Sequence, residues 1–552
     1  MHQYENLIKM NLKGKQAIGM DVVIISTSHS QLAAFWQNRL EQMRGEIIKP
    51  QTYIIAIEED WPGGAGNGLG TLYAFQKARQ KAAALYGIDF DRLLSDGASI
   101  ALYHTAGHGA RLFPLTGCEY NDKSAIKLPS LIQNDQFMTL LEAVIKQTAI
   151  YAPYRKGRLS VFWGDQLFIP SNPVEYTPDH HIDILAKLLP FPSEQEWKIK
   201  EFTQYGFIGR HKGEVQIVDK SDYRTLQHLI EGRKFFIEDG SGLSLGSFSL
   251  SIPMLFALLE EFTPDLERKE EKMDSDSFLW MPMTLDLVSY VNAMSKKNIS
   301  VDIATAHYHR LQRFKKYFMQ NKENRNLLGI VDIGADSPWW NYGTTRSYFE
   351  NNLKLTKNGE ESELMRQFFH NPLHQNPDKH TGLIQRDSSS SPELIYQNPN
   401  PSPELKIDNN SCVLNCQIRS GHIVNSVLVG VCADHIEVDH CIIINSVAAR
   451  INARHSLIYH VLEDGDATLP PDSVRADCFL PRQDKIVKMQ TTLQYDGQAD
   501  WKVQLPGNRY SYEELSKMNM QINITETLQK AEEAKKRLSD YILVSLQTYR
   551  LG

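Results

Sequence analysis

The chain has little cysteine and no long apolar run. Its 552 residues include only six cysteines, and no two of them have CxxC spacing. This pattern excludes a disulfide scaffold and a zinc site, so we expect the cysteines to act as small apolar fillers. No apolar segment approaches the ~18–20 residues that span a bilayer, and the N-terminus lacks a basic stretch followed by an apolar run. These absences predict a cytoplasmic protein with no membrane partner.

An excess of positive charge is also absent. The formal net charge is −7, which argues against broad adhesion to nucleic acid or to anionic membranes. A phosphate-bearing ligand would have to be held locally. What the chain does have is 42% hydrophobic and 23% charged residues, the profile of a soluble globular protein. Its length is too great for one ordinary core, so we expect at least two domains.

The first part of the sequence alternates strand-like and helix-like segments. β-Branched or apolar runs suited to buried strands occur at 21–26, 53–57, 99–104 and 159–163. Between the first two runs, apolar residues recur at helical spacing after Ser30, which can serve as the N-cap. This alternation predicts an α/β domain over residues 1–370 with a Rossmann-like, mostly parallel sheet.

The remaining sequence changes character twice. Residues 371–404 are rich in Asn, Pro, Asp, Ser and His and are interpreted as a linker or mobile loop. Residues 405–470 carry short apolar triplets about fifteen residues apart, which is typical of a small parallel left-handed β-helix; ordinary antiparallel strands are the alternative. Residues 471–552 are predicted to be a C-terminal extension, irregular after Pro470, that ends in a helix from Thr525 to Tyr549.

A glycine-containing loop directly follows the third predicted strand. It reads Gly107-His108-Gly109-Ala110-Arg111. Glycines allow the backbone amides to approach phosphate oxygens closely, and Arg111 can add a bidentate contact. A bare GxG is weak support, because tight turns after strands also use glycine.

The residues after this loop give it a specific meaning. Arg111, Pro114 and Thr116 form an RxxPxT pattern. Joined to the glycines, it resembles the signature of sugar-nucleotide pyrophosphorylases, nucleotidyltransferases that join a sugar 1-phosphate to a nucleoside triphosphate. The early strand at 21–26 and the glycine-rich segment 66–72 are most similar to one branch. That branch contains fucose-1-phosphate guanylyltransferase and the pyrophosphorylase part of bifunctional fucokinase enzymes.

The resemblance implies a nucleotidyltransferase fold and a site for a nucleoside triphosphate. Arg111 and Lys123 would be catalytic, and Lys127 is an alternative to Lys123 that fits the family's interval less well. Asp165, at the end of the fourth predicted strand, would bind Mg²⁺, because carboxylate oxygens suit this ion. The implied nucleotide-binding residues are Gly107, His108, Gly109, Ala110, Gly68 and Gly164.

A second group of residues resembles the sugar-phosphate side of the family's site. Its members are Gly206, Lys220, Gly242, Asn341 and Thr344. The chain departs from the family pattern in two places: no proline follows Lys220, and Asn341 stands where many relatives have a metal-binding aspartate. Asp286 could supply that second metal ligand, although an aspartate at a helix start is the other interpretation. The pair His180-His181 is interpreted as part of a surface loop.

The expected function is therefore the synthesis of a nucleotide-sugar, with release of pyrophosphate. Fucose 1-phosphate and GTP are the substrates that the resemblance implies, while the residues alone identify neither base nor sugar. One alternative is a β-helix acyltransferase or bifunctional enzyme that uses a coil histidine: His422, His435, His440 or His455. Another is a non-catalytic nucleotide-sugar-binding protein, since Asn341 departs from the pattern. The β-helix would also offer a surface for homo-oligomerisation.

Overall fold

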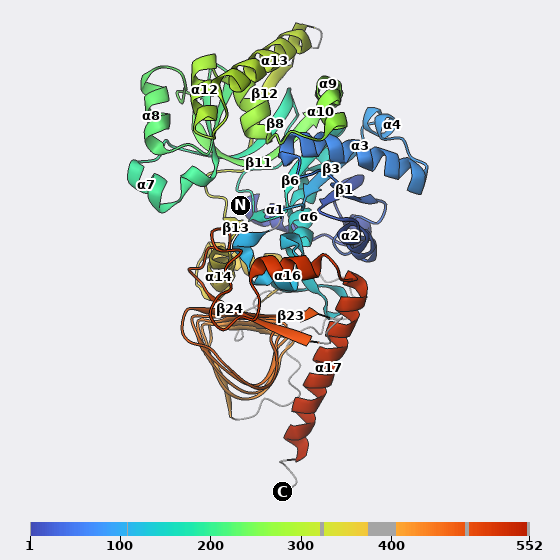
Figure 1. The fold of residues 1–552 in the computed structure, drawn as a ribbon, viewed down its shortest axis with the longest axis vertical. Helices are drawn as coiled ribbons and strands as arrows, with labels where there is room; N and C mark the ends of the chain where they lie inside the picture. Colours follow the sequence, from blue (N-terminus) through green and yellow to red (C-terminus); the bar gives the residue numbers. More distant parts are fainter. Residues whose placement is uncertain are drawn as a thin grey trace. The chain divides into compact units, whose positions relative to one another are not determined.

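The computed structural model describes residues 2–107, 109–320, 325–371, 373, 404–480 and 485–548. The chain forms two compact units (Figure 1). Unit 1 comprises Met1–Ala106, Lys146–Trp163 and Phe168–Pro338, and unit 2 comprises Gly107–Ile145, Gly164–Leu167 and Trp339–Gly552. This division differs from the domain borders predicted at residues 370 and 405, because segments from the first half of the chain belong to unit 2. The predicted linker 371–404 lies almost wholly outside the described residues.

Unit 1 is built on a nine-stranded sheet. Its order is β10-β9-β11-β6-β3-β1-β2; β8 also pairs with β11, and β12 pairs with β8. The strands are β1 (Val22–Thr27), β2 (Tyr53–Glu58), β3 (Ser99–His104), β6 (Arg158–Trp163), β8 (His180–Leu189), β9 (Gly206–His211), β10 (Glu214–Asp219), β11 (Ser241–Ser251) and β12 (Asn326–Asp332). All six residues of β1 are buried, as expected for a β-branched strand covered on both faces.

The sheet is mixed rather than mostly parallel. β2, β1, β3 and β6 run parallel to one another, and these are the four strands predicted from sequence. β11 is antiparallel to β6, β8 and β9, and β10 is antiparallel to β9. The later strands do not alternate regularly with helix-like segments in the sequence. Their direction was therefore not indicated by the sequence.

Helices pack on this sheet. α2 contacts β1 and β2, while α3 contacts β1, β2 and β3, and α9 contacts β6, β8 and β11. α2 begins at Ser30, but its N-cap is His29, whose side chain accepts a hydrogen bond from Leu32 N. The helices are α1 (His2–Met10), α2 (Ser30–Gln42), α3 (Gly66–Tyr86), α4 (Phe90–Ser95), α7 (Glu194–Ile199), α8 (Tyr223–Glu231), α9 (Ile252–Glu261), α10 (Thr263–Arg268), α11 (Met281–Thr284), α12 (Leu287–Ser295) and α13 (Val301–Gln320).

Unit 2 contains a region of stacked parallel strands, here named the coil region (residues 404–480). Two sheets have the orders β14-β16-β18-β20-β22 and β15-β17-β19-β21-β23. Their strands are β14 (Leu405–Ile407), β15 (Cys412–Leu414), β16 (Gln417–Val424), β17 (Val427–Val429), β18 (Cys432–Asp439), β19 (Ile442–Ile444), β20 (Val447–Arg454), β21 (Leu457–Tyr459), β22 (Leu462–Thr468) and β23 (Ser473–Leu480). All pairs within this stack are parallel, so the alternative of antiparallel strands is wrong.

The coil region repeats every fifteen residues. Val427 pairs with Ile442, which pairs with Leu457. Corner residues in the left-handed region of φ recur at the same interval, in the series Asn415, Gly430, Asn445, His460 and the series Asn425, His440, His455. Apart from glycine, Asn and His are among the residue types that tolerate this conformation best. These Asn, Gly and His residues are therefore the corners of the coils.

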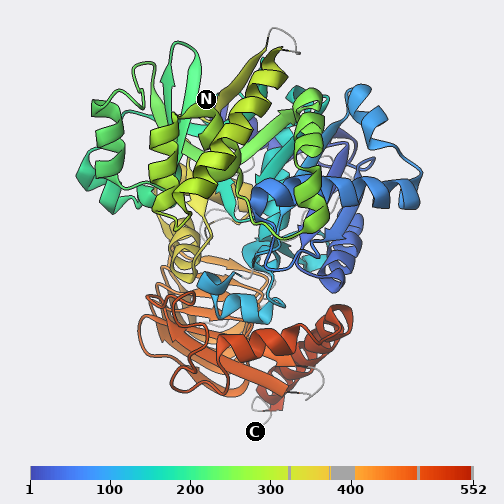
Figure 2. The same cartoon turned by 45° about the horizontal axis from the view of Figure 1, so that its top comes forward.

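Further elements complete unit 2. α17, predicted as a terminal helix, contacts β18, β20 and β22, and Figures 1 and 2 show it in red beside the stacked strands. The stretch after Pro470 is more regular than predicted, because β23 pairs antiparallel with β24. The remaining elements are β4 (Lys127–Leu131), β5 (Phe137–Thr139), β7 (Gln166–Phe168), β13 (Trp339–Asn341), β24 (Lys485–Thr492), α5 (Leu115–Cys118), α14 (Thr345–Leu353), α15 (Glu360–Phe369), α16 (Tyr512–Asn519) and α17 (Ile524–Thr548); α6 (Leu140–Thr148) runs across the border of the two units.

The cysteines of the coil region are buried. Burial raises the pKa of Cys412, Cys416 and Cys441 to about 12, which keeps these thiols protonated and unreactive near neutral pH. This matches their predicted role as apolar fillers. As for membranes, none of the helices in the described ranges has the length and apolar character needed to cross a bilayer.

Candidate functional site

The predicted phosphate loop belongs to unit 2. Gly109 has a φ of +60°, and a Cβ added there would lie 2.8 Å from Thr116 Cγ2 and 3.0 Å from Lys123 Cβ. Both the backbone conformation and the available space therefore require glycine. Gly107 approaches the same lysine, since its Cβ position is 3.9 Å from Lys123 Nζ. The predicted nucleotide-binding residue His108 lies outside the described residues.

Lys123 faces the predicted metal ligand Asp165. Lys123 opens the 3-10 turn η3 (Lys123–Ala125), whose N-cap Asp122 accepts a hydrogen bond from Ser124 N. Its Nζ donates to Asp165 Oδ2 over 2.8 Å, and the two side chains are only 17% and 15% exposed. Salt screens a sheltered pair less than an exposed one. A cationic group is thus held against the carboxylate that the sequence assigns to Mg²⁺.

Asn341 joins this group through the backbone. β13 pairs with β7, and Tyr342 N donates to Asp165 O over 2.9 Å. Asn341 Oδ1 accepts a hydrogen bond from Gly343 N over 2.8 Å, which closes a tight turn. The Cβ position of Gly343 lies 2.9 Å from Asn341 Oδ1 and 3.7 Å from Arg111 Nη2. The turn therefore places the asparagine beside the arginine of the loop.

Arg111 presents an exposed guanidinium. It follows Ala110 in the short 3-10 turn η2 (Ala110–Leu112), and a Cβ added to Gly497 would lie 2.0 Å from Ala110 O. Among the described residues, none forms an ion pair or hydrogen bond with the Arg111 side chain. A planar, permanently charged group in this position can bind an anion through two parallel hydrogen bonds.

Thr344 is already engaged as a helix cap. Its hydroxyl accepts a hydrogen bond from Ser347 N at the start of α14. The neighbouring Thr345 hydroxyl donates to Phe113 O over 3.0 Å, which fastens α14 to the segment behind the phosphate loop. The structure therefore gives Thr344 a local structural role, and its contact with a sugar phosphate stays a prediction.

Lys127 is used in a buried network and not at this site. Its Nζ lies 2.7 Å from Glu119 Oε1, and the same oxygen accepts a hydrogen bond from Tyr459 OH over 2.6 Å. His460 Nε2 lies 3.2 Å from it. Despite burial, Lys127 and His460 lower the pKa of Glu119 to about 2, so this carboxylate stays charged. Of the two lysines considered from sequence, only Lys123 faces Asp165.

The predicted residues of unit 2 thus come from three separate segments of sequence. Gly107 to Lys123, Gly164-Asp165 and Asn341 to Thr344 are far apart in the chain. The structure brings them into one local site, with two cationic groups, one carboxylate and one amide oxygen. The members are Gly107, Gly109, Arg111, Lys123, Asp165 and Asn341, and the predicted residues Ala110, Gly164 and Thr344 lie beside them in sequence.

Gly68 belongs to unit 1, where it has a packing role. The glycine-rich segment 66–72 forms the start of α3. Gly68 N donates to Met273 O over 2.8 Å, and a Cβ on Gly68 would lie 2.8 Å from that oxygen. Close approach of the 273–275 segment accounts for this glycine, and its contact with a nucleotide stays a prediction.

The other predicted residues of unit 1 lie on three neighbouring strands. Gly206 starts β9 and is paired with Asp219, the last residue of β10. Lys220 follows with a φ of +49°, exposed and, within the described part, without a hydrogen bond or ion pair for its ammonium group. Gly242 lies further along β11, where a Cβ would come within 2.5 Å of Lys187 O. The structure brings Gly206 and Lys220 together, while Gly242 is required by sheet packing.

Asp286 caps a helix. Its carboxylate accepts hydrogen bonds from Val288 N over 3.1 Å and Ser289 N over 3.2 Å at the start of α12. These bonds and the Ser289 hydroxyl outweigh partial burial and lower the pKa of Asp286. The helix-start interpretation of this residue is confirmed.

Sequence reasoning missed a charged cluster beside Lys220. Lys297 forms an ion pair with Asp219, whose Oδ2 also accepts a hydrogen bond from Ser277 Oγ over 2.6 Å. Asp276 lies against Gly206, with 3.2 Å between its Oδ2 and the Cβ position of the glycine. Asp219 directly precedes Lys220 in the sequence, so it could have been found. Asp276 and Lys297 have no motif around them.

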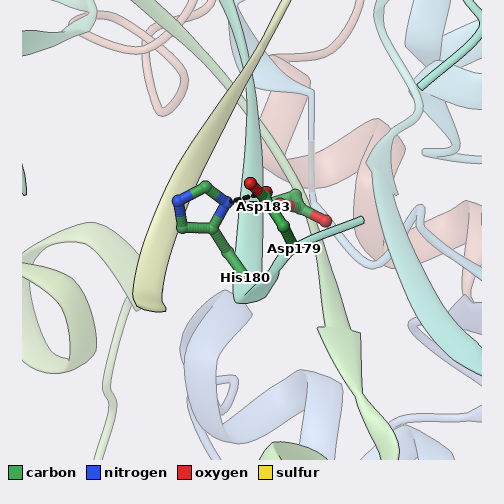
Figure 3. Close-up of side chains that lie close together, drawn as sticks. All are labelled: Asp179, His180 and Asp183. Carbon is green, nitrogen blue, oxygen red and sulfur yellow. Dashed lines mark ion pairs between the residues drawn. The ribbon is translucent and has the colours of Figure 1, made fainter. Parts of the chain in front are cut away.

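A second candidate for metal binding lies at the start of β8. Asp179, His180 and Asp183 could each offer one ligand atom (Figure 3). His180 Nδ1 lies 2.5 Å from Asp179 Oδ1 and 3.7 Å from Asp183 Oδ1. However, the buried guanidinium of Arg158 lies 2.9 Å from Asp183 Oδ2, and its positive charge opposes a second cation. We assign these groups to an ion-pair network.

The histidine pair in this region is not a surface loop as predicted. His180 begins β8, and His181 is buried, with its Nδ1 2.8 Å from Ser251 Oγ. The Pro- and Asp-rich residues before the pair suggested a loop. However, the apolar residues after His181 are buried in β8 and place the strand inside the sheet.

The coil histidines considered for acyl transfer are paired with carboxylates. His422 and His435 both lie near Glu437, His440 lies near Asp439, and His455 lies near Asp472. Each is partly exposed on the outside of the coils. No feature of the described residues points one of these histidines at an acyl-group site.

Comparison with known proteins adds no identification. No protein-family model matches the chain. No curated protein matches it either.

Proposed function

We propose that this chain is a sugar-1-phosphate nucleotidyltransferase, which joins a nucleoside triphosphate to a sugar 1-phosphate and releases pyrophosphate. The observation that carries the proposal is the meeting of Arg111, Lys123 and Asp165 around a loop that requires glycine. The sequence order of these residues resembles that of the pyrophosphorylase family. GTP and fucose 1-phosphate are the substrates favoured by the resemblance, and a left-handed twist of the coil region belongs to the same proposal.

The phosphate loop and two cationic groups would hold the triphosphate. Backbone amides at Gly107 and Gly109 would approach its oxygens, because no Cβ stands in the way. Arg111 would bind two oxygens in parallel, and Lys123 would neutralise charge that develops as the leaving group departs. Most of the rate enhancement would come from orientation and charge compensation.

Mg²⁺ fits the donor set of this site. Asp165 supplies a carboxylate and Asn341 an amide oxygen, which also accepts a hydrogen bond from Gly343 N. Two protein oxygens suffice, because Mg²⁺ usually keeps several waters and binds substrate phosphates. The bound ion would neutralise phosphate charge. Lys123 would then exchange part of its contact with Asp165 for a contact with the triphosphate.

The chemical step needs no general base. An oxygen of the sugar phosphate is already an anion and attacks the α-phosphorus of the triphosphate. One phosphorus–oxygen bond forms to the sugar phosphate while the bond to the β-phosphate oxygen breaks, and pyrophosphate carries away the electron pair. Lys220 in unit 1, exposed and unpaired in the described part, is the proposed ligand of the sugar phosphate.

A pyrophosphate-release screen tests this function. The purified full chain is mixed with Mg²⁺ and each combination of a common nucleoside triphosphate and a panel of sugar 1-phosphates. We expect release to depend on both substrates and to be highest for one pair. Release from triphosphate alone, or from none of the combinations, would contradict the proposal. Calorimetry then separates a nucleotide-sugar-binding protein, which would bind the product without turnover.

A further inference from the structure

Asp276 in unit 1 has a carboxyl group without a protein partner. It lies in the π-helical turn η7 (Ser275–Trp280), and its Oδ1 is buried with no hydrogen-bond partner among the described residues. Its other oxygen lies beside Gly206, where any side chain would crowd it. Leaving a buried acceptor unsatisfied costs free energy, so such a group calls for a ligand or another explanation.

The charges around Asp276 are only partly balanced within the protein. Asp219 is neutralised by Lys297 and accepts a hydrogen bond from Ser277 Oγ. Asp276 has no ion-pair partner in the described structure, and neither has Lys220 at the end of β10. One carboxyl group and one ammonium group in the same neighbourhood are therefore both available to a ligand.

The glycine-rich start of α3, with Ala65 before it, holds the turn that carries Asp276. Met273 N donates to Ala65 O over 2.9 Å, and Gly68 N donates back to Met273 O. The side chain of Asn67 bonds to Ser275 through its Nδ2 and Oδ1, over 2.8 and 2.9 Å. A Cβ at Gly66 would lie 2.7 Å from the Met273 backbone. These contacts hold the turn against the start of α3.

The protonation of Asp276 suits a neutral, hydroxyl-bearing partner. Burial and the nearby charge of Asp219 raise the pKa of Asp276 to about 8. The other charged groups that face it are Asp274, which raises the pKa further, and Lys220 and Lys297, which oppose the rise. Near pH 7 the group is therefore mostly a neutral carboxyl, which can both donate and accept a hydrogen bond.

We propose that Asp276 recognises ring hydroxyls of the sugar 1-phosphate whose phosphate group Lys220 binds. This inference rests on the proposed function. It assigns recognition of the sugar 1-phosphate to two residues of unit 1. Asp276 would then determine which sugars are accepted, because a hydroxyl that cannot reach it leaves the buried carboxyl unsatisfied.

Calorimetry on the full chain with three probes tests the proposal. The probes are fucose 1-phosphate, glucose 1-phosphate and inorganic phosphate, which has no ring hydroxyls. We expect Asp276→Ala to weaken binding of the preferred sugar 1-phosphate by about 10-fold or more and to leave binding of inorganic phosphate unchanged. Lys220→Gln is expected to weaken binding of all three. Asp302→Asn, an equivalent change at an exposed position of α13, is the matched control.

The isosteric variant gives a second, independent readout. Asn resembles a neutral carboxyl, so Asp276→Asn should keep the affinity at pH 7 within about threefold. In the wild type, affinity for the sugar 1-phosphate should fall above pH 8, as Asp276 loses its proton near the bound phosphate. In the Asn variant this fall should be absent.

Three results would overturn the inference. They are unchanged affinity in Asp276→Ala, equal losses in the Ala and Asn variants, and the same pH dependence in Asp276→Asn as in the wild type. Because the readout is binding of one substrate, it is separate from turnover. If the wild type releases pyrophosphate and these results appear, the inference fails while the proposed function stands. If no pyrophosphate is released but the sugar phosphate binds as expected, the proposed function fails while the assignment of Asp276 to the sugar stands.

Discussion

At the scale of single residues, the Lys123–Asp165 pair is the most informative contact in unit 2. Its partners stand 42 positions apart in sequence, yet their charged atoms are 2.8 Å apart. A surface ion pair would contribute little to stability. This one is sheltered and stands next to a loop in which the Cβ positions of Gly107 and Gly109 both approach Lys123. Its arrangement suits a group that exchanges partners when a ligand binds.

Removing either member of the pair should reduce turnover. We expect Lys123→Ala and Asp165→Ala each to lower kcat/KM by on the order of 10²-fold, because each removes a preorganised electrostatic group. Steady-state kinetics on the substrate pair selected by the screen measure this effect. Lys517→Ala is the matched control, since this lysine is 69% exposed on α16 and pairs with Glu513. Near wild-type turnover in a folded Asp165→Ala variant would refute the metal assignment.

Sequence predicted the unit 2 residues better than those of unit 1. Arg111, Lys123 and Asp165 follow one another in a recognisable order, and the structure brings them together. Gly68 was singled out for its motif, but contact with Met273 explains it without a ligand. Asp276 could not be found, because its environment arises from the meeting of β9, β10 and η7, which a linear pattern does not display.

At the scale of elements, the fifteen-residue repeat shows how a weak sequence signal becomes a regular structure. The apolar triplets at 427–429, 442–444 and 457–459 are completely buried and stack in register. Parallel pairing was predictable, because each triplet needs an equivalent neighbour to cover it. The antiparallel pairing of β11 was not, since its buried residues fit either direction.

Gly421 provides a test of the coil packing. Its φ is +120°, and a Cβ would lie 1.8 Å from Ile436 O of the next coil. We expect Gly421→Ala to lower the free energy of unfolding by about 2–4 kcal/mol, through backbone strain and loss of the close approach. Denaturant unfolding followed by circular dichroism measures the change.

Gly465→Ala serves as the control within the same region. Gly465 has nothing within 4 Å of its Cβ position, and its φ is not in the left-handed range. Its substitution should change stability by less than about 1 kcal/mol. Equal effects at positions 421 and 465 would show that contact between successive coils does not determine the stability of this region.

At the scale of the whole molecule, the two candidate phosphate-binding lysines belong to different units. Lys123 is part of unit 2 and Lys220 is part of unit 1. The proposed function therefore assigns each substrate to a lysine that is held in place by residues of its own unit. A change at one lysine should leave the local structure around the other intact.

This separation predicts that each lysine substitution removes the thermal stabilisation by one substrate and keeps the stabilisation by the other. A ligand at 100 times its Kd stabilises the folded state by about 2.7 kcal/mol. MgGTP should raise the Tm of the wild type and of Lys220→Gln but not of Lys123→Ala. Fucose 1-phosphate should raise the Tm of the wild type and of Lys123→Ala but not of Lys220→Gln. If each substitution abolished both shifts, separate binding of the two substrates would be ruled out.

The passage of the chain between the units has a consequence for its synthesis on the ribosome. Residues 107–145 belong to unit 2, but apart from 164–167 the rest of that unit begins only at Trp339, about 190 residues later. At ~5–20 residues per second, the phosphate-loop segment is synthesised ~15–60 s before Tyr459 and the strands that contact β4. During this interval its apolar side chains lack their final partners. The nascent chain should therefore be most dependent on chaperones after residue 145 has emerged and before the coil region is complete.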